Sequence, residues 1–164
     1  MKHLWSPWRS KYIQTFKKSS KKRKNADSLF TAAWKSRQDD KHFIVWRGTH
    51  CFVIMNRYPY NSGHLMIVPN RQTSEFQDLS AEELEEIMQT AQRAMKALDR
   101  VMRPQGYNFG ANIGRASGAG VDDHIQFHIV PRWNGDTNFM PVLSHTKVIS
   151  EDMKETLKKL RRLF

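Results

Sequence analysis

The sequence has almost no cysteine and no long apolar run. Cys51 is its single cysteine, so no intramolecular disulfide can form, and its place inside the run CFVIM favours a buried thiol in a reducing compartment. No window approaches the roughly 18 consecutive apolar residues of a membrane span. The N-terminal stretch also lacks an apolar segment long enough for a secretory signal. We therefore expect a cytoplasmic protein that does not contact membranes.

The sequence has fewer acidic residues than basic ones. Lys and Arg number 27 against 16 Asp and Glu, which gives a net charge of +11. The segment KKSSKKRK (17–24) supplies six of these positive charges and leaves +5 on the rest of the chain. That excess suits a ligand that carries phosphate. Residues 1–16 are rich in aromatic and aliphatic side chains, so we expect 1–24 to be an N-terminal arm and basic linker before one domain at 25–164.

The composition is that of a folded, water-soluble domain. The chain has 164 residues, enough to bury its own core, and hydrophobic residues make up 39% of it. Apolar spacing of three and four predicts helices from Asp27 or Ser28, over 80–102 and from Ser150. β-Branched and aromatic runs predict five strands, at 42–48, 51–56, 64–69, 107–114 and 124–131. This order indicates an antiparallel α+β fold, not a doubly wound one.

The segment HIQFHIVP places three polar residues at alternating positions of an expected strand. Side chains alternate between the faces of a strand, so His124, Gln126 and His128 share one face. The Gly-rich loop GRASGAG (114–120) precedes them, and such a loop can offer backbone N–H groups to phosphate oxygens. On spacing alone, an edge strand with a solvated polar face beside an ordinary turn is the favoured interpretation.

Several motifs together resemble the histidine-triad family. HIQFHIVPRWNGDTNFMPV is similar to the signature His-φ-His-φ-His-φ-φ, followed in one bacterial and archaeal branch by Pro-Arg-Trp and Gly-Asp-Thr-Asn-Phe. That branch holds the diadenosine-polyphosphate phosphorylases, or ATP adenylyltransferases. MKHLWSPWRSKYI resembles its N-terminal arm, VIMNRYPYNSGHLMIVP its asparagine and Gly-His strands, and NIGRASGAGVDDH its phosphate loop. The resemblance runs almost the whole length.

The resemblance implies a fold and a class of ligand. The fold is a five-stranded antiparallel sheet with packed helices, and two copies form a homodimer with a continuous ten-stranded sheet. The ligand is an adenine nucleotide or a dinucleoside polyphosphate. Phe52, Ile54 and Asn56 then lie near the base and ribose.

The resemblance also implies roles around the phosphates. Asn112, Gly120 and Val121 contact them, His64 supports the triad strand, and His128 contacts the phosphate or the leaving group. His124 holds the first triad position.

Gln126 departs from the family pattern at the middle triad position, which belongs to the nucleophile. A neutral imidazole attacks the α-phosphorus through a ring nitrogen and forms a nucleotidyl intermediate. The nitrogen lone pair of an amide is delocalised into its carbonyl, so Gln126 can hydrogen-bond a phosphate oxygen but cannot replace the nucleophile. Loss of such a nucleophile can cost on the order of 10⁶ in rate. Turnover is therefore expected to be impaired, while binding persists.

Three explanations of Gln126 stay open. The chain is a natural non-catalytic nucleotide binder, or an engineered variant that traps its substrate, or an enzyme in which His128 or His124 serves as a weaker nucleophile. The corresponding functions are a dinucleoside-polyphosphate hydrolase or phosphorylase and a nucleotide sensor. A nucleic-acid contact through 17–24 is a third candidate that we do not favour, because basic linkers are usually only solvated.

The second departure concerns metal. Many members of the family carry Cys-x-x-Cys near the first helix, which binds structural zinc together with two histidines. The matching stretch here is SLFT (28–31). Hydroxyls are poor zinc ligands, and His50 with His124 alone would make a weak site. We predict no metal and no cofactor, with Ser28 capping the helix.

Overall fold

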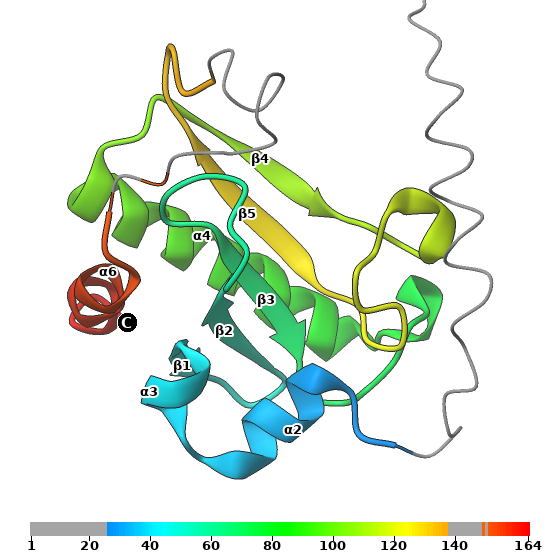
Figure 1. The fold of residues 1–164 in the computed structure, drawn as a ribbon. Coiled ribbons are helices and arrows are strands. Elements are labelled where there is room, and N and C mark those ends of the chain that lie inside the picture. The colour runs from blue at the N-terminus through cyan, green and yellow to red at the C-terminus, as the bar shows by residue number, and fades with distance from the viewer. Residues whose placement is uncertain (1–25, 138–148, 150) are drawn as a thin grey trace, which may run out of the picture.

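The computed structural model describes residues 26–137, 149 and 151–164, so the predicted arm and linker at 1–24 lie outside the described residues. The elements follow one another in the predicted order of hairpin, strand, helix, two strands and helix (Figure 1). They are α2 (Leu29–Ser36), α3 (Asp39–His42), β1 (Ile44–Arg47), β2 (Cys51–Met55), β3 (Leu65–Pro69), the 3₁₀ turn η2 (Phe76–Asp78), α4 (Ala81–Met102), β4 (Gly106–Ala111), the 3₁₀ turn η3 (Arg115–Ser117), β5 (Phe127–Arg132) and α6 (Met153–Arg161).

The five strands form one antiparallel sheet in the order β1-β2-β3-β5-β4, which confirms the predicted α+β fold. The C-terminal strand β5 thus lies inside the sheet, between β3 and β4. Its register places Leu65 opposite Ile129 on one side and Gly110 opposite His128 on the other. β4 is an edge strand, and its residues Asn108 to Gly110 are exposed.

One face of the sheet packs on α4, which runs behind it in Figure 1. The sequence pattern Ser-x-x-Glu at 80–83 predicts a capping box, and Ser80 and Glu83 form one at the start of this helix. Ile87, Ala91 and Leu98 are buried against the strands. Cys51 lies in the same core, fully buried, and burial raises the pKa of its thiol to about 12. The prediction of a buried structural cysteine is confirmed.

The other face of the sheet carries a smaller apolar cluster, to which only β1, β2 and β3 contribute. Phe30 of α2 packs there on side chains from β1, β2 and β3, namely Ile44, Phe52, Ile54, Met66 and Val68. Figure 1 shows α2 in front of the ends of β2 and β3, whereas no helix lies in front of β4. The half of this face formed by β5 and β4 borders an open cleft.

The predicted starts of two strands were wrong, for local reasons, and the strand predicted at 107–114 ends earlier, at Ala111. The strand predicted at 42–48 begins at Ile44, because α3 precedes it and Phe43 ends that helix with a left-handed φ of 58°. The strand predicted at 124–131 begins only at Phe127. The backbone N–H of Ile125 donates to the carbonyl of Thr73 at 2.7 Å and not to a neighbouring strand.

The last helix begins at Met153 with Asp152 as its cap, and the predicted start at Ser150 lies outside the described residues. Within the described part of the chain, no helix is long and apolar enough to span a membrane.

Candidate functional site

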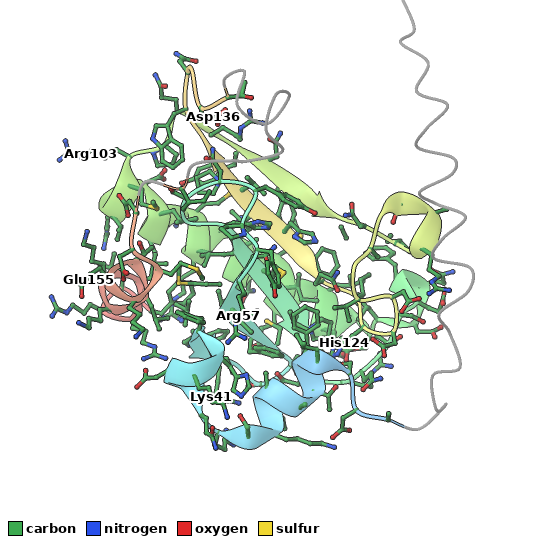
Figure 2. The ribbon with its side chains drawn as sticks, in the orientation of Figure 1. Lys41, Arg57, Arg103, His124, Asp136 and Glu155 are labelled. Atoms are coloured by element: carbon green, nitrogen blue, oxygen red, sulfur yellow. The ribbon has the colours of Figure 1, made fainter. Side chains whose placement is uncertain are left out.

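The three residues of the triad segment point away from the α4 core. Their neighbours Ile125, Phe127 and Ile129 are all part of that core, so the predicted alternation is confirmed. His124 lies next to α2, and Asp136 marks the opposite end of β5 (Figure 2). The three polar residues therefore span the distance from α2 to the open half of the sheet.

His124 is held between α2 and the end of β3. Its Nε2 lies 2.8 Å from the carbonyl oxygen of Pro69, so Nε2 carries the proton and donates. Its Nδ1 then accepts from the hydroxyl of Ser28 at 2.7 Å, with Thr31 Oγ1 3.4 Å away. His124 is 1% exposed, and burial lowers the pKa of its imidazole. His124 is thus a neutral structural residue that fixes the start of the triad segment.

Ser28 confirms its predicted role as the cap of α2, and it also holds His124. Its Oγ accepts from the backbone N–H of Thr31 at 3.0 Å while the hydroxyl donates to the ring. Replacing Ser28 with alanine removes both bonds and leaves a buried acceptor unpaired. We expect the free energy of unfolding to fall by about 2–3 kcal/mol. Urea titration measures it, with Ser74→Ala as control, because the Ser74 hydroxyl bonds only to the surface carboxylate of Glu75; a loss below about 0.5 kcal/mol would contradict a structural role for Ser28.

This cluster does not fit zinc. Ser28 and Thr31 supply hydroxyls that are already bonded to His124 and to Gln72. Zinc in structural sites takes thiolates and imidazoles, and hydroxyls are not among its usual ligands. No group of three or more His, Cys, Asp or Glu side chains able to hold a metal occurs within residues 26–137, 149 and 151–164. Hydrogen bonds from its hydroxyls and an edge-to-face contact with Phe30 tie α2 to His124.

A directed chain of hydrogen bonds leads from the backbone to His128. The N–H of Tyr60 donates to Nδ1 of His64 at 3.1 Å, and the amide of Asn56 lies 3.3 Å from the same nitrogen. Nε2 of His64 must therefore carry the proton, which it donates to Nδ1 of His128 at 2.9 Å. His128 then carries its own proton on Nε2. The sequence predicted that His64 supports the triad strand, and these contacts describe how it could do so.

His64 and His128, the two histidines linked by these hydrogen bonds, are both neutral. Burial, followed by the neighbouring His128, lowers the pKa of His64 to about 3. Burial also lowers the pKa of His128. Tyr60 packs on both rings, with centroids 4.8 Å from His64 and 6.0 Å from His128. The fixed tautomers make His128 a hydrogen-bond donor on the side away from His64.

Two buried polar atoms at the centre of the site have no hydrogen-bond partner in the described part of the chain. They are Nε2 of His128 and Oε1 of Gln126, whose side chain is only 4% exposed. Buried polar groups in folded proteins nearly always have a partner, and an exception calls for an explanation. Since the His128 nitrogen is a donor, an anionic oxygen is the partner that would satisfy it best.

The residues predicted near a base and ribose lie beside this centre. Phe52 and Ile54 are buried under α2, and Val121 packs against the same cluster. Asn56 bonds within its own loop, where its Oδ1 accepts from the N–H of Tyr58 at 2.9 Å while its amide nitrogen faces His64. Contact between these residues and a nucleoside stays a prediction.

The predicted phosphate loop between β4 and β5 is held by its glycines and by an ion pair. Gly114 and Gly118 have φ values of 73° and 91°, which other residues rarely adopt, and they bracket the turn η3. Arg115 pairs with Asp122 at 2.7 Å across the loop. Asn112 lies at its start, half-buried, and Gly120 is exposed near its end.

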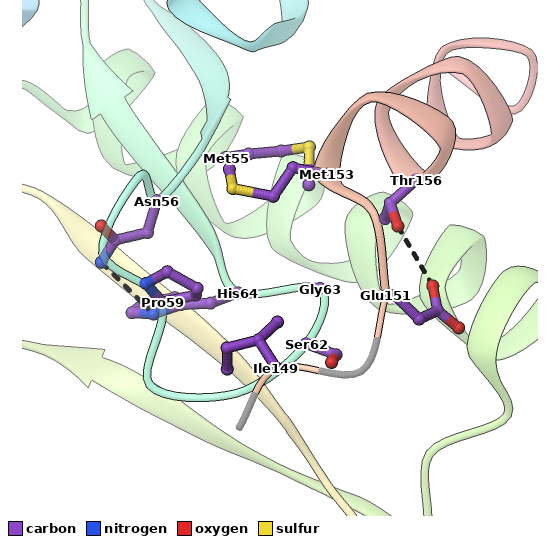
Figure 3. A pocket seen from close by; sticks show the side chains of 10 residues that line it. All are labelled: Met55, Asn56, Pro59, Ser62, Gly63, His64, Ile149, Glu151, Met153 and Thr156. Atoms are coloured by element: carbon purple, nitrogen blue, oxygen red, sulfur yellow. Dashed lines mark hydrogen bonds between the residues drawn. The ribbon is translucent and has the colours of Figure 1, made fainter. Parts of the chain in front are cut away.

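Predicted residues of the site line a cavity that is large enough for a nucleotide. An open cleft of about 430 Å³ lies over β4 and β5, with His128 and Asn112 in its wall. The cavity in Figure 3, behind His64 and next to Met153, measures about 10 Å³ and could take one water molecule. Arg132 and Tyr60 also line the large cleft, and sequence reasoning missed both.

Known proteins share the sequence of this region. A sequence model described as the HIT domain matches residues 37–135. The AP-4-A phosphorylase of Mycobacterium tuberculosis is 35% identical over 158 residues, which cover 95% of this chain and 80% of that protein. The bis(5'-adenosyl)-triphosphatase of Dictyostelium discoideum is 27% identical over 143 residues, 84% of this chain and 93% of that protein.

Solved structures share the fold. A zinc-bound histidine triad family protein from Mycobacterium smegmatis superposes with a TM-score of 0.68 at 24% identity, over 84% of this chain and 92% of that one. The diadenosine triphosphate hydrolase of Plasmodium falciparum superposes with a TM-score of 0.61 at 17% identity, over 93% of this chain and 95% of that one.

Proposed function

Because the chain belongs to the histidine-triad (HIT) family, we propose that it binds adenine nucleotide phosphates and dinucleoside polyphosphates between Gln126 and His128. The observation that carries this proposal is a pair of buried polar atoms, His128 Nε2 and Gln126 Oε1, that no other described residue satisfies. A phosphate group would accept from His128 Nε2–H, and the Gln126 amide, turned over, could donate to a second oxygen. The printed names of two relatives, an AP-4-A phosphorylase and a bis(5'-adenosyl)-triphosphatase, support the class of ligand.

The surrounding residues receive the remaining roles. Asn112, Gly120 and Val121 contact phosphates from the loop, and Phe52, Ile54 and Asn56 lie on the side of the base and ribose. His64 orients His128 through their 2.9 Å hydrogen bond. His124 acts only through its position at the start of the segment.

Turnover is proposed to be impaired, because Gln126 supplies no nucleophilic nitrogen. His124 cannot replace it, since both of its ring nitrogens are engaged by Ser28 and Pro69. In His128 the nitrogen with an available lone pair is Nδ1, and that lone pair accepts from His64. A non-catalytic nucleotide sensor therefore fits the hydrogen bonds better than an enzyme that uses another histidine.

We further propose a homodimer in the cytoplasm. β4 is an edge strand, so its backbone could extend the sheet across two copies. Phe109 on this strand is 38% exposed and stacks on Phe127, and Phe76 nearby is 40% exposed. Exposed aromatic side chains near a strand edge that no other described strand pairs with favour association with a second copy.

Calorimetry tests the binding proposal. We expect AMP to bind and adenosine to bind far more weakly, because adenosine has no phosphate to accept from His128. The variant His128→Leu should weaken AMP binding by roughly 10- to 100-fold, the usual effect of removing a hydrogen bond to a charged group. His42→Gln on α3 is the matched control. Equal affinities for AMP and adenosine, or no loss in His128→Leu, would refute a phosphate site at this position.

A further inference from the structure

The open cleft over β4 and β5 extends well beyond the place where a single phosphate would sit. It measures about 430 Å³, a volume typical of sites for small ligands. His128 and Asn112 lie in its wall, and so does Arg132. Arg132 is four residues after His128 on the same face of β5, which places their backbones about 13 Å apart. One phosphate at His128 would leave most of this cleft empty.

Arg132 is held in one orientation by its neighbours. Its Nε and one terminal nitrogen donate to the carboxylate of Asp136 at 2.6 and 2.9 Å, and the other terminal nitrogen donates to Oδ1 of Asn108 at 2.7 Å. The Asp136 side chain is only 6% exposed and also accepts from the amide of Asn61 at 2.8 Å. The guanidinium is therefore fixed in place while its side chain remains 45% exposed to the cleft.

The fixed guanidinium has hydrogen-bonding capacity left over. Guanidinium carries five N–H donors, and three of these are used in the bonds to Asp136 and Asn108. The remaining two have no partner in the described part of the chain. A rigid arginine with two available N–H groups suits the oxygens of a phosphate better than a mobile lysine would. Asp136 offsets the charge of Arg132, so the attraction depends on these directed hydrogen bonds.

An aromatic ring also lines the cleft. Tyr60 is 53% exposed and nearly parallel to the ring of His128, at an interplanar angle of 20°. Its outer surface is available to a planar group, and nucleic-acid bases stack on such rings. The cleft thus offers a first phosphate position at His128, a second phosphate contact at Arg132 and an aromatic surface at Tyr60.

We propose that this cleft is a subsite for the distal half of a dinucleoside polyphosphate, in which Arg132 contacts the phosphates beyond the one at His128 and Tyr60 stacks on the distal base. This inference rests on the proposed function, because it takes the first phosphate to lie at His128. It makes Arg132 and Tyr60 specificity-determining residues that favour a dinucleotide over a mononucleotide.

The alternative is that Arg132 only stabilises the turn through its pair with Asp136. The two roles separate when AMP is compared with a methylene-bridged analogue of diadenosine tetraphosphate by calorimetry. We expect the wild type to bind the analogue about tenfold more tightly or better. Arg132→Gln should weaken binding of the analogue about tenfold and change AMP binding by less than about twofold. Arg100→Gln, at the end of α4 behind the sheet, is the matched control.

A second variant avoids the loss of a partner for Asp136. Asn108→Glu places a carboxylate in the cleft, where it can still accept from Arg132 but repels phosphate. This variant should weaken binding of the analogue and leave AMP binding unchanged, whereas Gln92→Glu on α4 should leave the binding of both ligands unchanged. Equal wild-type affinities for AMP and the analogue, or equal losses for both ligands in the two cleft variants, would overturn the subsite alone. Failure of either ligand to bind the wild type would overturn the proposed function as well.

Discussion

Replacing Gln126 with histidine is expected to raise the rate of diadenosine tetraphosphate cleavage by about 10³-fold or more over the parent. Loss of a catalytic nucleophile costs on the order of 10⁶, and an introduced one recovers a part of that. The substitution suits the geometry because the side-chain ε atoms of glutamine and histidine are the same number of bonds from Cβ. Gln126 Oε1 is already buried beside the triad strand without a partner in the described residues.

The assay measures turnover with and without inorganic phosphate, because the relatives include a phosphorylase as well as a triphosphatase. Gln126→Leu, of similar volume, is the control and should stay at the parent's background. AMP affinity measured on the same preparations distinguishes a lost site from a lost nucleophile. A parent that already turns over as fast as Gln126→His would refute impaired turnover, and an inactive Gln126→His that still binds AMP would refute the assigned position of the nucleophile.

Mild acid is expected to destabilise the folded protein through His64. Its pKa is about 3 in the folded state, against about 6.5 for histidine in an unfolded chain. Between these values the unfolded state binds one more proton, so the free energy of unfolding falls by about 1.4 kcal/mol for each pH unit below 6.5. Burial also lowers the pKa of His124 and of His128, so both contribute with the same sign.

From pH 6.5 to pH 5, His64 alone should remove about 2 kcal/mol of stability, and stability is fully present above pH 6.5. Urea titrations at pH 7, 6 and 5 measure this dependence. His64→Gln replaces the imidazole with an amide that does not titrate, so the profile of this variant should be shallower by about 1.4 kcal/mol per pH unit. Identical slopes for the two proteins would show that His64 does not stay neutral in the folded state.

Local signals in the sequence predicted the fold well. The capping box at Ser80 and Glu83 depends on a four-residue pattern and is present as predicted. Apolar spacing over 80–102 also predicts Met88 on the buried face of α4, and there the prediction is wrong: Met88 is 51% exposed, while Ile87 beside it is buried. α3 was missed, since four residues are too few to show a helical period.

The sequence predicted those parts of the candidate site whose chemistry depends on the type of side chain. The positions of His64, Gln126 and His128 followed from motifs. The donor to His64 is a backbone amide, at Tyr60, and no residue type at that position could reveal it. The orientation of Arg132 likewise depends on Asn108, which is 24 residues away in the chain and meets it only through the pairing of β4 with β5.

The hydrogen bonds from Tyr60 through His64 to His128 also limit how protons can move in the site. A proton relay must be reloaded from its far end, and here the far end is a peptide N–H, which does not ionise near neutral pH. If His128 gave up its Nε2 proton, His64 could replace it only by becoming an imidazolate. Any proton that His128 donates to a ligand must therefore return from the ligand's side. These hydrogen bonds orient and polarise His128 but do not carry protons to it.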